Sequence, residues 1–584
     1  MIAPATDPAC ERIISDLLVR MTADEKIGQL TWIPAPESRE STDWEELEQQ
    51  IAAGRVGAVI GTGDCGQAER LQSIAQDRSR LAIPLLLPLD VGNGIETIMP
   101  APPALAASWD TEAVEGAAAV IASEARETGA NWLHSSDLSS SWLVELASQD
   151  RSTGRHLAGQ IVRAFVSGLH DTDCPSRVTF PFAQGDRARD ACGREIQPDR
   201  IDEAVAQVLR LKIGLGLIGK TPVPAVCRAS RSLPTPVHNR EVALDLARKC
   251  AVLLRNEPRL LPLGIDSGEI LVVGAAATDR HAPLAGKQGV AASVIDGLEQ
   301  LGIPHRFVAG LALRETGEAS GPMRAADPMA IAMASEAAKR AGTVIFVHAS
   351  HEEGGLSEAD AALLDALVTA NPRVAMVTLG HAPLDPSVAG HSLPAVLHAG
   401  QLGTMSGHAI AELLTGEASP SGRLPAALLP GGGDAELPFG HGLSYSEVTL
   451  RNLIVDSGPD RIGLTCELEN LGDRFGSETV QVYLGPLEET DDSPASNPLH
   501  LVALRKIWFD PGEREFLHFD LGCAEFRFHA DDAGIPVRHG RYCLRVGLNA
   551  KLALEREIVL TRTLASAMER PDTDPSPLAL HREA

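Results

Sequence analysis

Short apolar runs alternate with helical patterns along the first part of the chain. Three runs lie between turn residues, at Val56–Ile60, Ile83–Asp90 and Ala130–His134, and a weaker fourth, Val178–Ala183, contains Pro181. Such runs are typical of buried parallel strands. The alternation predicts a parallel α/β domain. The helical patterns between the runs cover residues 11–30, Thr111–Glu127, Thr153–Leu169 and Ile201–Ile213.

The first helical pattern is interrupted at Thr22, which has Glu25 three residues after it. This spacing predicts a capping box, in which the threonine side chain caps a second helix and the glutamate bonds back to the cap. We therefore expect two consecutive helices in residues 11–30.

The same rhythm continues more regularly in the middle of the chain. Apolar runs again alternate with helical patterns, which predicts a doubly wound parallel sheet. The expected strands are Ile270–Gly274, Thr343–Val347, Val374–Leu379 and Leu393–His398. The expected helices are Arg240–Leu254, Met329–Ala341, Glu358–Thr369 and Ser406–Leu414.

The pattern changes after residue 438, where strand-like segments are separated by turn clusters. This pattern predicts an antiparallel β-sandwich. The expected strands are Arg461–Asn470, Ser477–Leu484, Leu501–Phe509, Glu515–Leu521 and Tyr542–Leu548. The predicted domains are then 1–219, 237–430 and 431–565, with a proline-containing linker at 220–236 and a disordered tail at 566–584.

Charge and composition narrow the possible partners. The 584 residues carry a net charge of −27, which argues against nucleic acid or an anionic membrane surface. We find no signal-peptide pattern and no apolar run of membrane-spanning length, so we expect a cytoplasmic protein. Nine scattered cysteines without a Cys/His cluster indicate neither a metal site nor a disulfide framework, and we expect no cofactor.

Segments along nearly the whole chain resemble glycoside hydrolase family 3, the β-glucosidase family. They are Glu11–Leu30, Leu81–Asp110, Arg200–Leu217, Val252–Leu263 (VLLRNEPRLLPL), His398–Pro425 (HAGQLGTMSGHAIAELLTGEASPSGRLP) and Leu437–Tyr445 (LPFGHGLSY). The resemblance implies a TIM-barrel-like domain, an α/β sandwich and a fibronectin III-like β-sandwich, in that order. It also implies an enzyme that cleaves small glycosides.

The barrel is where the chain departs from this family. Three or four strands are predicted where a (β/α)₈ barrel needs eight, so we expect a truncated barrel. The resemblance gives Asp90, in Pro88–Gly94 (PLDVGNG), the role of binding sugar hydroxyls. It matches Asp137–Glu145 (DLSSSWLVE) to the family's R-D-P-R-W-G-R segment, where Trp142 remains and both arginines are gone, and makes Asp137 and Trp142 substrate-binding candidates.

The family's catalytic nucleophile is an aspartate on a strand that we do not find. No Lys-His pair occurs in the chain, and the aspartates between Leu169 and Arg200 do not follow an apolar strand in the family pattern. Asp186 or Asp190 could serve as a substitute carboxylate. Classical retaining hydrolysis, which needs a nucleophile and an acid, is therefore expected to be lost.

The family's acid/base glutamate comes from a loop that corresponds here to His348–Ser357 (HASHEEGGLS). Glu353 matches best and Glu352 is the alternative register, although both could be ordinary solvated loop charges. His351 is a substrate-binding candidate. With His348 it could form a new acid/base pair or a weak metal site, or both could be ordinary polar loop residues.

Three functions follow from these observations. The first is a repurposed enzyme acting on a glycosylated or polyol-like small molecule, with a pocket between Asp90 and the loop His348–Ser357. The second is a catalytically inactive pseudoenzyme that binds a glycan or a partner protein. The third is a weak β-glucosidase with a substitute carboxylate. Because an incomplete parallel sheet leaves edges and faces that need cover, we also expect a homo-oligomer or a first domain packed on the second.

Overall fold

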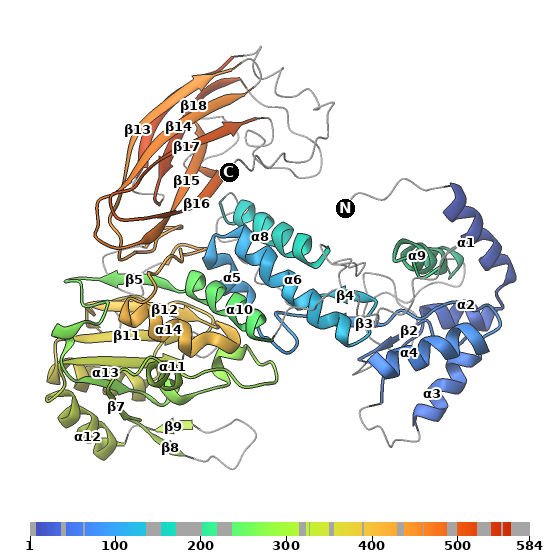
Figure 1. The fold of residues 1–584 in the computed structure, drawn as a ribbon, viewed down its shortest axis with the longest axis horizontal. Helices are drawn as coiled ribbons and strands as arrows, with labels where there is room; N and C mark the ends of the chain where they lie inside the picture. Colours follow the sequence, from blue (N-terminus) through green and yellow to red (C-terminus); the bar gives the residue numbers. More distant parts are fainter. Residues whose placement is uncertain are drawn as a thin grey trace.

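A computed structural model gives the architecture of the chain. It describes residues 8–36, 43–61, 65–135, 153–170, 201–218, 236–314, 323–325, 327–349, 355–387, 390–428, 437–458, 461–487, 499–522, 539–549 and 553–561. Three regions follow one another: an N-terminal region of helices and short parallel strands, a central α/β region and a C-terminal region of antiparallel sheets (Figure 1).

Four short parallel strands form the centre of the N-terminal region. They are β1 Trp32–Pro34, β2 Ala58–Ile60, β3 Pro88–Asp90 and β4 Trp132–His134. Strand β1 pairs with β2 and β3 pairs with β4, while a parallel bridge between Ala58 and Leu86 joins the two pairs. Because all four run in the same direction, their carboxyl ends lie at one edge, where parallel-sheet proteins place their sites.

Helices cover both faces of these four strands. Neighbouring residues point to opposite sides, so Val59, Leu85 and Leu87 join one apolar cluster while Ala58, Leu86 and Trp132 join another. The first cluster is completed by helices α3 Asp43–Ala52 and α4 Cys65–Ser73. The second is completed by α9 Ile201–Gly214 and the residues directly after it. Helices α1 Pro8–Arg20 and α2 Ala23–Leu30 pack against α9.

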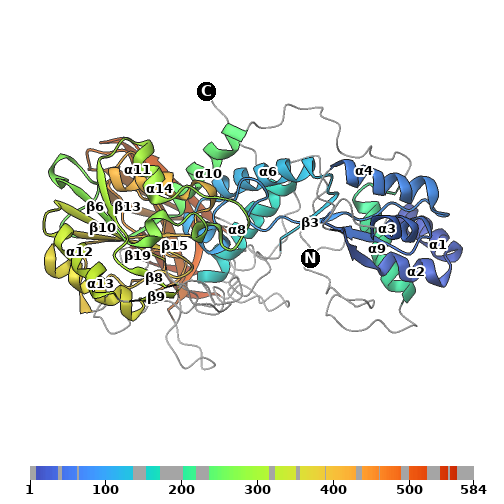
Figure 2. The ribbon, with the colours of Figure 1, turned by 90° about the horizontal axis from the view of Figure 1, so that it is seen from below.

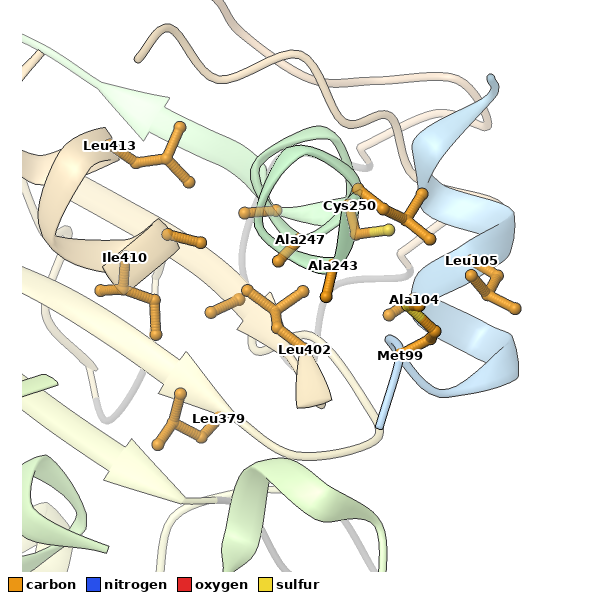
Figure 3. Packing of buried hydrophobic residues seen from close by; sticks show 14 of the residues in the cluster. Met99, Ala104, Leu105, Ala243, Ala247, Cys250, Leu379, Leu402, Ile410 and Leu413 are labelled. Atoms are coloured by element: carbon orange, nitrogen blue, oxygen red, sulfur yellow. The ribbon is translucent and has the colours of Figure 1, made fainter. Parts of the chain in front are cut away.

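Three further helices connect the N-terminal region to the rest of the molecule. They are α5 Pro102–Ser108, α6 Thr111–Glu127 and α8 Thr153–His170. Their buried side chains share one hydrophobic cluster with helix α10 Pro236–Cys250 and the central sheet. Figure 3 shows Met99, Ala104 and Leu105 on one side of this cluster, facing Ala243, Ala247 and Cys250 of α10. The first region is therefore packed against the second through these three helices.

The central region is a six-stranded sheet in the order β5-β12-β11-β10-β6-β7. All pairs are parallel except the one between β5 and β12. Helices α10, α11 and α14 pack on one face, and α12 and α13 pack on the other (Figures 1 and 2). The strands are β5 Val252–Asn256, β6 Ile270–Val273, β7 His305–Val308, β10 Thr343–Ala349, β11 Val374–Leu379 and β12 Ala395–Gly400. The helices are α10 Pro236–Cys250, α11 Val294–Gln300, α12 Pro328–Ala338, α13 Glu358–Ala370 and α14 Ser406–Thr415. A small antiparallel pair, β8 Ala312–Arg314 and β9 Met323–Ala325, lies outside the main sheet.

The C-terminal region consists of two antiparallel sheets. One has the order β13-β14-β17 and the other β16-β15-β18-β19. A separate apolar cluster lies between them. Alternate residues of β14, Ile462, Leu464, Cys466 and Leu468, are buried in it. The strands are β13 Val448–Ser457, β14 Ile462–Asn470, β15 Gly476–Pro486, β16 His500–Phe509, β17 Arg514–Leu521, β18 Gly540–Gly547 and β19 Ala553–Leu560.

Most elements lie where the sequence predicted them, with a few corrections. The capping box of Thr22 and Glu25 is present. The helix expected over Arg240–Leu254 ends at Cys250, because its last residues start strand β5. Strands β1, β5, β7, β8, β9, β13 and β19 and helices α3, α4, α5 and α11 were not predicted. Cys65 forms a disulfide, contrary to our expectation from the scattered cysteines. The strand expected at Val178–Ala183, nearly all of the linker at 220–236 and the tail at 566–584 lie outside the described residues.

Candidate functional site

Asp90 is the last residue of strand β3 and lies at the carboxyl edge of the four parallel strands. It is exposed, and its Oδ1 atom accepts a hydrogen bond of 3.1 Å from the backbone N–H of Gly92. This turn fixes the carboxylate at the point where the chain leaves the sheet. Next to it, the hydroxyl of Ser135, which directly follows β4, donates to the carbonyl of Gly92 at 3.3 Å. Asp90 therefore has the position that a ligand-binding carboxylate needs in a parallel-sheet protein.

The loop after Asp90 is held in shape by buried polar groups. Asn93 and Met99 close it with two hydrogen bonds, one from the Asn93 side chain to the Met99 carbonyl at 2.7 Å and one from the Met99 N–H to the Asn93 carbonyl at 2.8 Å. The buried carboxylate of Glu124, on α6, accepts hydrogen bonds from the N–H groups of Glu96 and Thr97, both at 3.0 Å. Its other oxygen accepts from the Asn239 side chain of α10 at 3.0 Å. Glu124 thus fastens this loop to the central region.

The same loop contacts the residues that follow strand β12. Ile98 and Thr404 exchange two hydrogen bonds of 2.9 Å, and the N–H of Ala101 donates to the Gln401 carbonyl at 2.9 Å. A Cβ atom on Gly403 would lie 2.1 Å from the Ile98 carbonyl oxygen, so only glycine permits this approach. The end of strand β3 and the end of strand β12 are therefore linked through one short, rigid loop.

Large side chains fill the side of the four strands that α9 covers. Trp32 and Trp132 meet edge to face, with ring centroids 5.3 Å apart and planes at 78°. Leu211, Leu215 and Leu217 pack against this pair. In the described part of the region, the face of the strands opposite α3 and α4 is thus occupied by tryptophan and leucine side chains.

The carboxyl ends of the central strands carry a row of buried polar residues. His348 of β10 lies beside Thr378 of β11, and Thr378 lies beside His398 of β12. The Thr378 hydroxyl and Nδ1 of His398 are 2.9 Å apart, and burial lowers the pKa of His398 to about 4, with a further contribution from nearby His381. His348 is also buried, with Nδ1 3.6 Å from a carboxylate oxygen of Asp360. His348 therefore lies inside strand β10 and not in a loop, which corrects the loop placement that we expected.

The structure describes one of the site residues suggested by the sequence, Asp90. Glu352, Glu353, His351, Asp137 and Trp142 lie outside the described residues, as do Asp186 and Asp190. Within the described ranges, no group of three or more His, Cys, Asp or Glu side chains could hold a metal ion, and no helix is long and apolar enough to cross a membrane. Sequence reasoning missed Glu124 and Thr404. A lone glutamate within the alanine-rich segment 117–125 is a signal that could have identified the first.

Comparison with known families gives two matches that are consecutive along the chain. Residues 22–213 match the family model of the glycosyl hydrolase family 3 N-terminal domain. Residues 251–445 match "Glycosyl hydrolase family 3 C-terminal domain". The two halves of the family are thus found in their usual order.

Characterised relatives carry related names. A periplasmic β-glucosidase of Salmonella typhimurium is 22% identical over 736 aligned positions, which cover 94% of this chain and 95% of the relative. A lysosomal β-glucosidase of Dictyostelium discoideum is 25% identical, covering 68% of this chain. A β-xylosidase of Formosa agariphila is 26% identical over 62% of this chain, which spans 55% of that relative's length.

Solved structures show the same fold. The β-glucosidase of Listeria innocua superposes with a TM-score of 0.74 at 20% identity, covering 94% of this chain and 99% of that chain. A β-glucosidase from Erythrobacter marinus superposes with a TM-score of 0.77 at 20% identity, covering 94% and 98%. At this identity the likeness establishes the architecture and leaves substrate and reaction to be argued separately.

Proposed function

The chain belongs to glycoside hydrolase family 3, and on that premise we propose that it is a remodelled member acting on a small glycosylated or polyol-like molecule, without ordinary β-glucosidase turnover. The observation that carries this proposal is the position of Asp90. It is an exposed carboxylate at the carboxyl edge of four parallel strands, and a rigid loop joins it to the central region. A carboxylate in that place can accept hydrogen bonds from sugar hydroxyls.

Two observations support the loss of ordinary hydrolysis. The sequence has no aspartate in the family's nucleophile pattern. In addition, the alignment with the Salmonella relative runs over 736 positions, whereas this chain has 584 residues, so the relative has residues that this chain lacks. Retaining hydrolysis needs two carboxyl groups about 5–5.5 Å apart, and losing the nucleophile costs orders of magnitude in rate.

We interpret the architecture accordingly. The four parallel strands and their helices represent a shortened TIM-barrel-like domain, in which α9 and its leucines occupy the space that further strands would fill. The two antiparallel sheets represent a fibronectin III-like domain. We keep Glu353, or Glu352, as the proposed proton donor, and Asp137 and Trp142 as proposed substrate contacts, because the resemblance assigns them these roles. His351 is a further proposed contact because it stands next to the two glutamates in the sequence.

A second candidate function is a pseudoenzyme that binds a glycan without changing it. The filled side of the strands favours this alternative, since Trp32 and Trp132 occupy it together with leucines of the α9 segment. A side of the strands that is filled with apolar side chains leaves less room for a reacting sugar. Product formation distinguishes the two functions. The enzyme converts its ligand into a product, whereas the pseudoenzyme binds the ligand and leaves it chemically unchanged.

The test combines turnover with binding. We expect para-nitrophenyl β-glucoside to be hydrolysed well below the usual range of about 1–10³ s⁻¹, measured by release of nitrophenolate. Binding of glucose and of glycoside mixtures is measured by calorimetry, and conversion by mass spectrometry. Ordinary turnover of the β-glucoside would show that the chain is an active β-glucosidase with a substitute carboxylate, such as Asp186 or Asp190.

The site is tested with Asp90→Asn. This change removes the charge but leaves an oxygen that can accept the Gly92 hydrogen bond, so the fold should be kept. A matched control is Asp327→Asn, because Asp327 accepts a hydrogen bond at 2.9 Å from the N–H of Met329, also two residues later, at the start of α12 in the central region. We expect ligand binding to fall in Asp90→Asn alone. Equal binding by both variants would remove Asp90 from the site.

A further inference from the structure

Two aromatic rings lie stacked and exposed on the surface of the C-terminal region. Phe475, directly before β15, and Trp508 of β16 have ring centroids 5.7 Å apart and planes at 10°, so the rings are almost parallel. Their exposed fractions are 53% and 37%. Aromatic side chains usually bury most of their surface, and an exposed aromatic pair next to polar groups often marks a binding site.

Both rings are held in place by their surroundings. The turn that carries Phe475 is fixed by the buried side chain of Asn470, which donates to the Arg474 carbonyl at 2.9 Å and accepts from the Gly472 N–H at 3.0 Å. On the other ring, the ammonium groups of Lys249 and Lys506 lie 5.4 Å and 5.9 Å from the Trp508 centroid. Cations at this distance are attracted to the ring and restrict its orientation.

The partners of these lysines lie in the N-terminal and central regions of the chain. Lys506 donates to the carbonyls of Ser108 and Ser421, at 2.8 Å and 3.0 Å. Lys249 pairs with Asp110 at 3.1 Å and with Asp245 at 2.9 Å. The aromatic pair therefore lies at the junction of α6, α10 and β16, where it is supported by a network of ion pairs. The Asp245 side chain is 54% exposed, so a carboxylate is available to solvent near the rings.

From these observations we infer that Phe475 and Trp508 form an accessory binding platform for a pyranose sugar, separate from the Asp90 site. The apolar C–H face of a pyranose packs on a flat aromatic surface, and its hydroxyls, which point outward, need donors and acceptors at the rim. Here the rings are stacked on one another, so the flat surface is the face of Phe475 that is turned away from Trp508. The Asp245 carboxylate, which is paired with Lys249 next to Trp508, lies near the ring pair. A shallow, open aromatic face suits a terminal sugar unit of a glycoside better than a deeply buried ligand.

This inference does not depend on the function proposed above, since the platform could hold a sugar whether or not the Asp90 site is active. The probe is methyl β-glucoside, with mannitol as a comparison, because mannitol carries the same kind of hydroxyls without a ring face. Binding is followed by saturation-transfer difference NMR and by the tryptophan fluorescence change on titration. We expect the glucoside to bind in about the millimolar range and mannitol to give no signal at the aromatic rings.

Three variants separate the possibilities. Phe475→Ala should weaken glucoside binding about fivefold to tenfold, the size of one aromatic contact. Phe516→Ala is the matched control, since Phe516 of β17 is 68% exposed in the same region and should leave the affinity unchanged. Asp90→Asn removes the other proposed site. Loss in Phe475→Ala and retention in Asp90→Asn and Phe516→Ala support the platform.

The remaining outcomes overturn it. Unchanged affinity in Phe475→Ala, or no binding by the wild-type chain, would show that the ring pair does not bind a sugar. Loss in Asp90→Asn with retention in Phe475→Ala would place the bound sugar at the strand ends, which supports the proposed function and rejects the platform. Because Phe475 is exposed and contributes little to the interior, Phe475→Ala should fold normally, as circular dichroism and the melting temperature can verify.

Discussion

The chain contains two parallel sheets that differ in length and in the way they are covered. The strands of the central sheet run for four to seven residues, and β6, β10, β11 and β12 are buried almost throughout. The strands of the N-terminal region have three residues each. The central sheet has helices on both faces and belongs to large apolar clusters. The N-terminal strands are covered by several smaller clusters instead.

This difference shows how a shortened parallel domain can be stabilised. Long buried strands need helices on both faces of their sheet, and the central sheet has them. The four N-terminal strands depend more on side chains from helices, above all α9, and on contact between Trp32 of β1 and Trp132 of β4. Their connection to the central region passes through α5, α6 and the loop bound by Glu124 and Thr404. Stability in the first region should therefore depend on this connection.

The largest expected effect concerns the connection itself. Trp109 follows α5, is completely buried, and packs on Phe439 with ring centroids 5.0 Å apart. Trp109→Ala should lower the free energy of unfolding by about 3–5 kcal/mol, the usual cost of removing a large buried aromatic side chain. Urea unfolding followed by circular dichroism measures it, with the exposed Phe516→Ala as control. Two separate transitions in the wild-type chain, with only one shifted by the substitution, would contradict the shared core.

Much of the fold could be predicted from the sequence. The alternation of apolar runs and helices in the central region is strong enough that β11 was predicted to the residue. Strand β5 was missed because its run Val-Leu-Leu fits a helix as well as a strand. Strand β13 was missed because the register shifts between Arg451 and Ile454, which breaks its alternation.

The site was harder to predict, for a physical reason. Asp90 could be located because strand ends are visible in a sequence. The groups that fix its loop come from distant segments: Thr404 is 306 residues from Ile98, and Glu124 is 27 residues from Thr97. Their contacts depend on tertiary packing, which has no local periodicity. The Phe475–Trp508 pair likewise forms only when β15 and β16 pair.

The second prediction concerns a buried charge in the N-terminal region. Lys212 of α9 is completely buried, and its ammonium donates to the Gln29 side chain at 2.7 Å. Burial lowers the pKa of Lys212 from 10.5 to about 7. Between these values the unfolded chain binds more protons than the folded chain, so this group makes stability rise with pH from about 7 to 10.5 and contributes no slope below 7.

Replacing the lysine should remove this dependence. The free energy of unfolding of the wild-type chain should rise between pH 7 and pH 10 because of Lys212. In Lys212→Met this rise should be smaller by on the order of 3 kcal/mol. Urea unfolding at pH 7, 8.5 and 10 measures it, and other titrating groups, including Lys506, cancel in the difference. Parallel pH profiles of the two proteins would show that Lys212 is not buried as a charge in the folded state.

The smallest expected effect compares matching helix caps in the two regions. The Thr22 hydroxyl accepts from the Glu25 N–H at 3.3 Å at the start of α2, and the Ser357 hydroxyl accepts from the Asp360 N–H at 3.1 Å at the start of α13. Replacing either residue by alanine should cost about 1 kcal/mol locally. Because α13 packs on the continuous central core, Ser357→Ala should lower the midpoint of global unfolding. Helix α2 packs in a smaller cluster, so Thr22→Ala should mainly speed amide hydrogen exchange in α2 and shift the global midpoint less.

Hydrogen exchange read by mass spectrometry, together with urea midpoints, distinguishes these responses. Equal midpoint shifts with no faster exchange in α2 would mean that the short-stranded region unfolds only together with the central sheet, so that the connection through α5 and α6 is as strong as the central core itself.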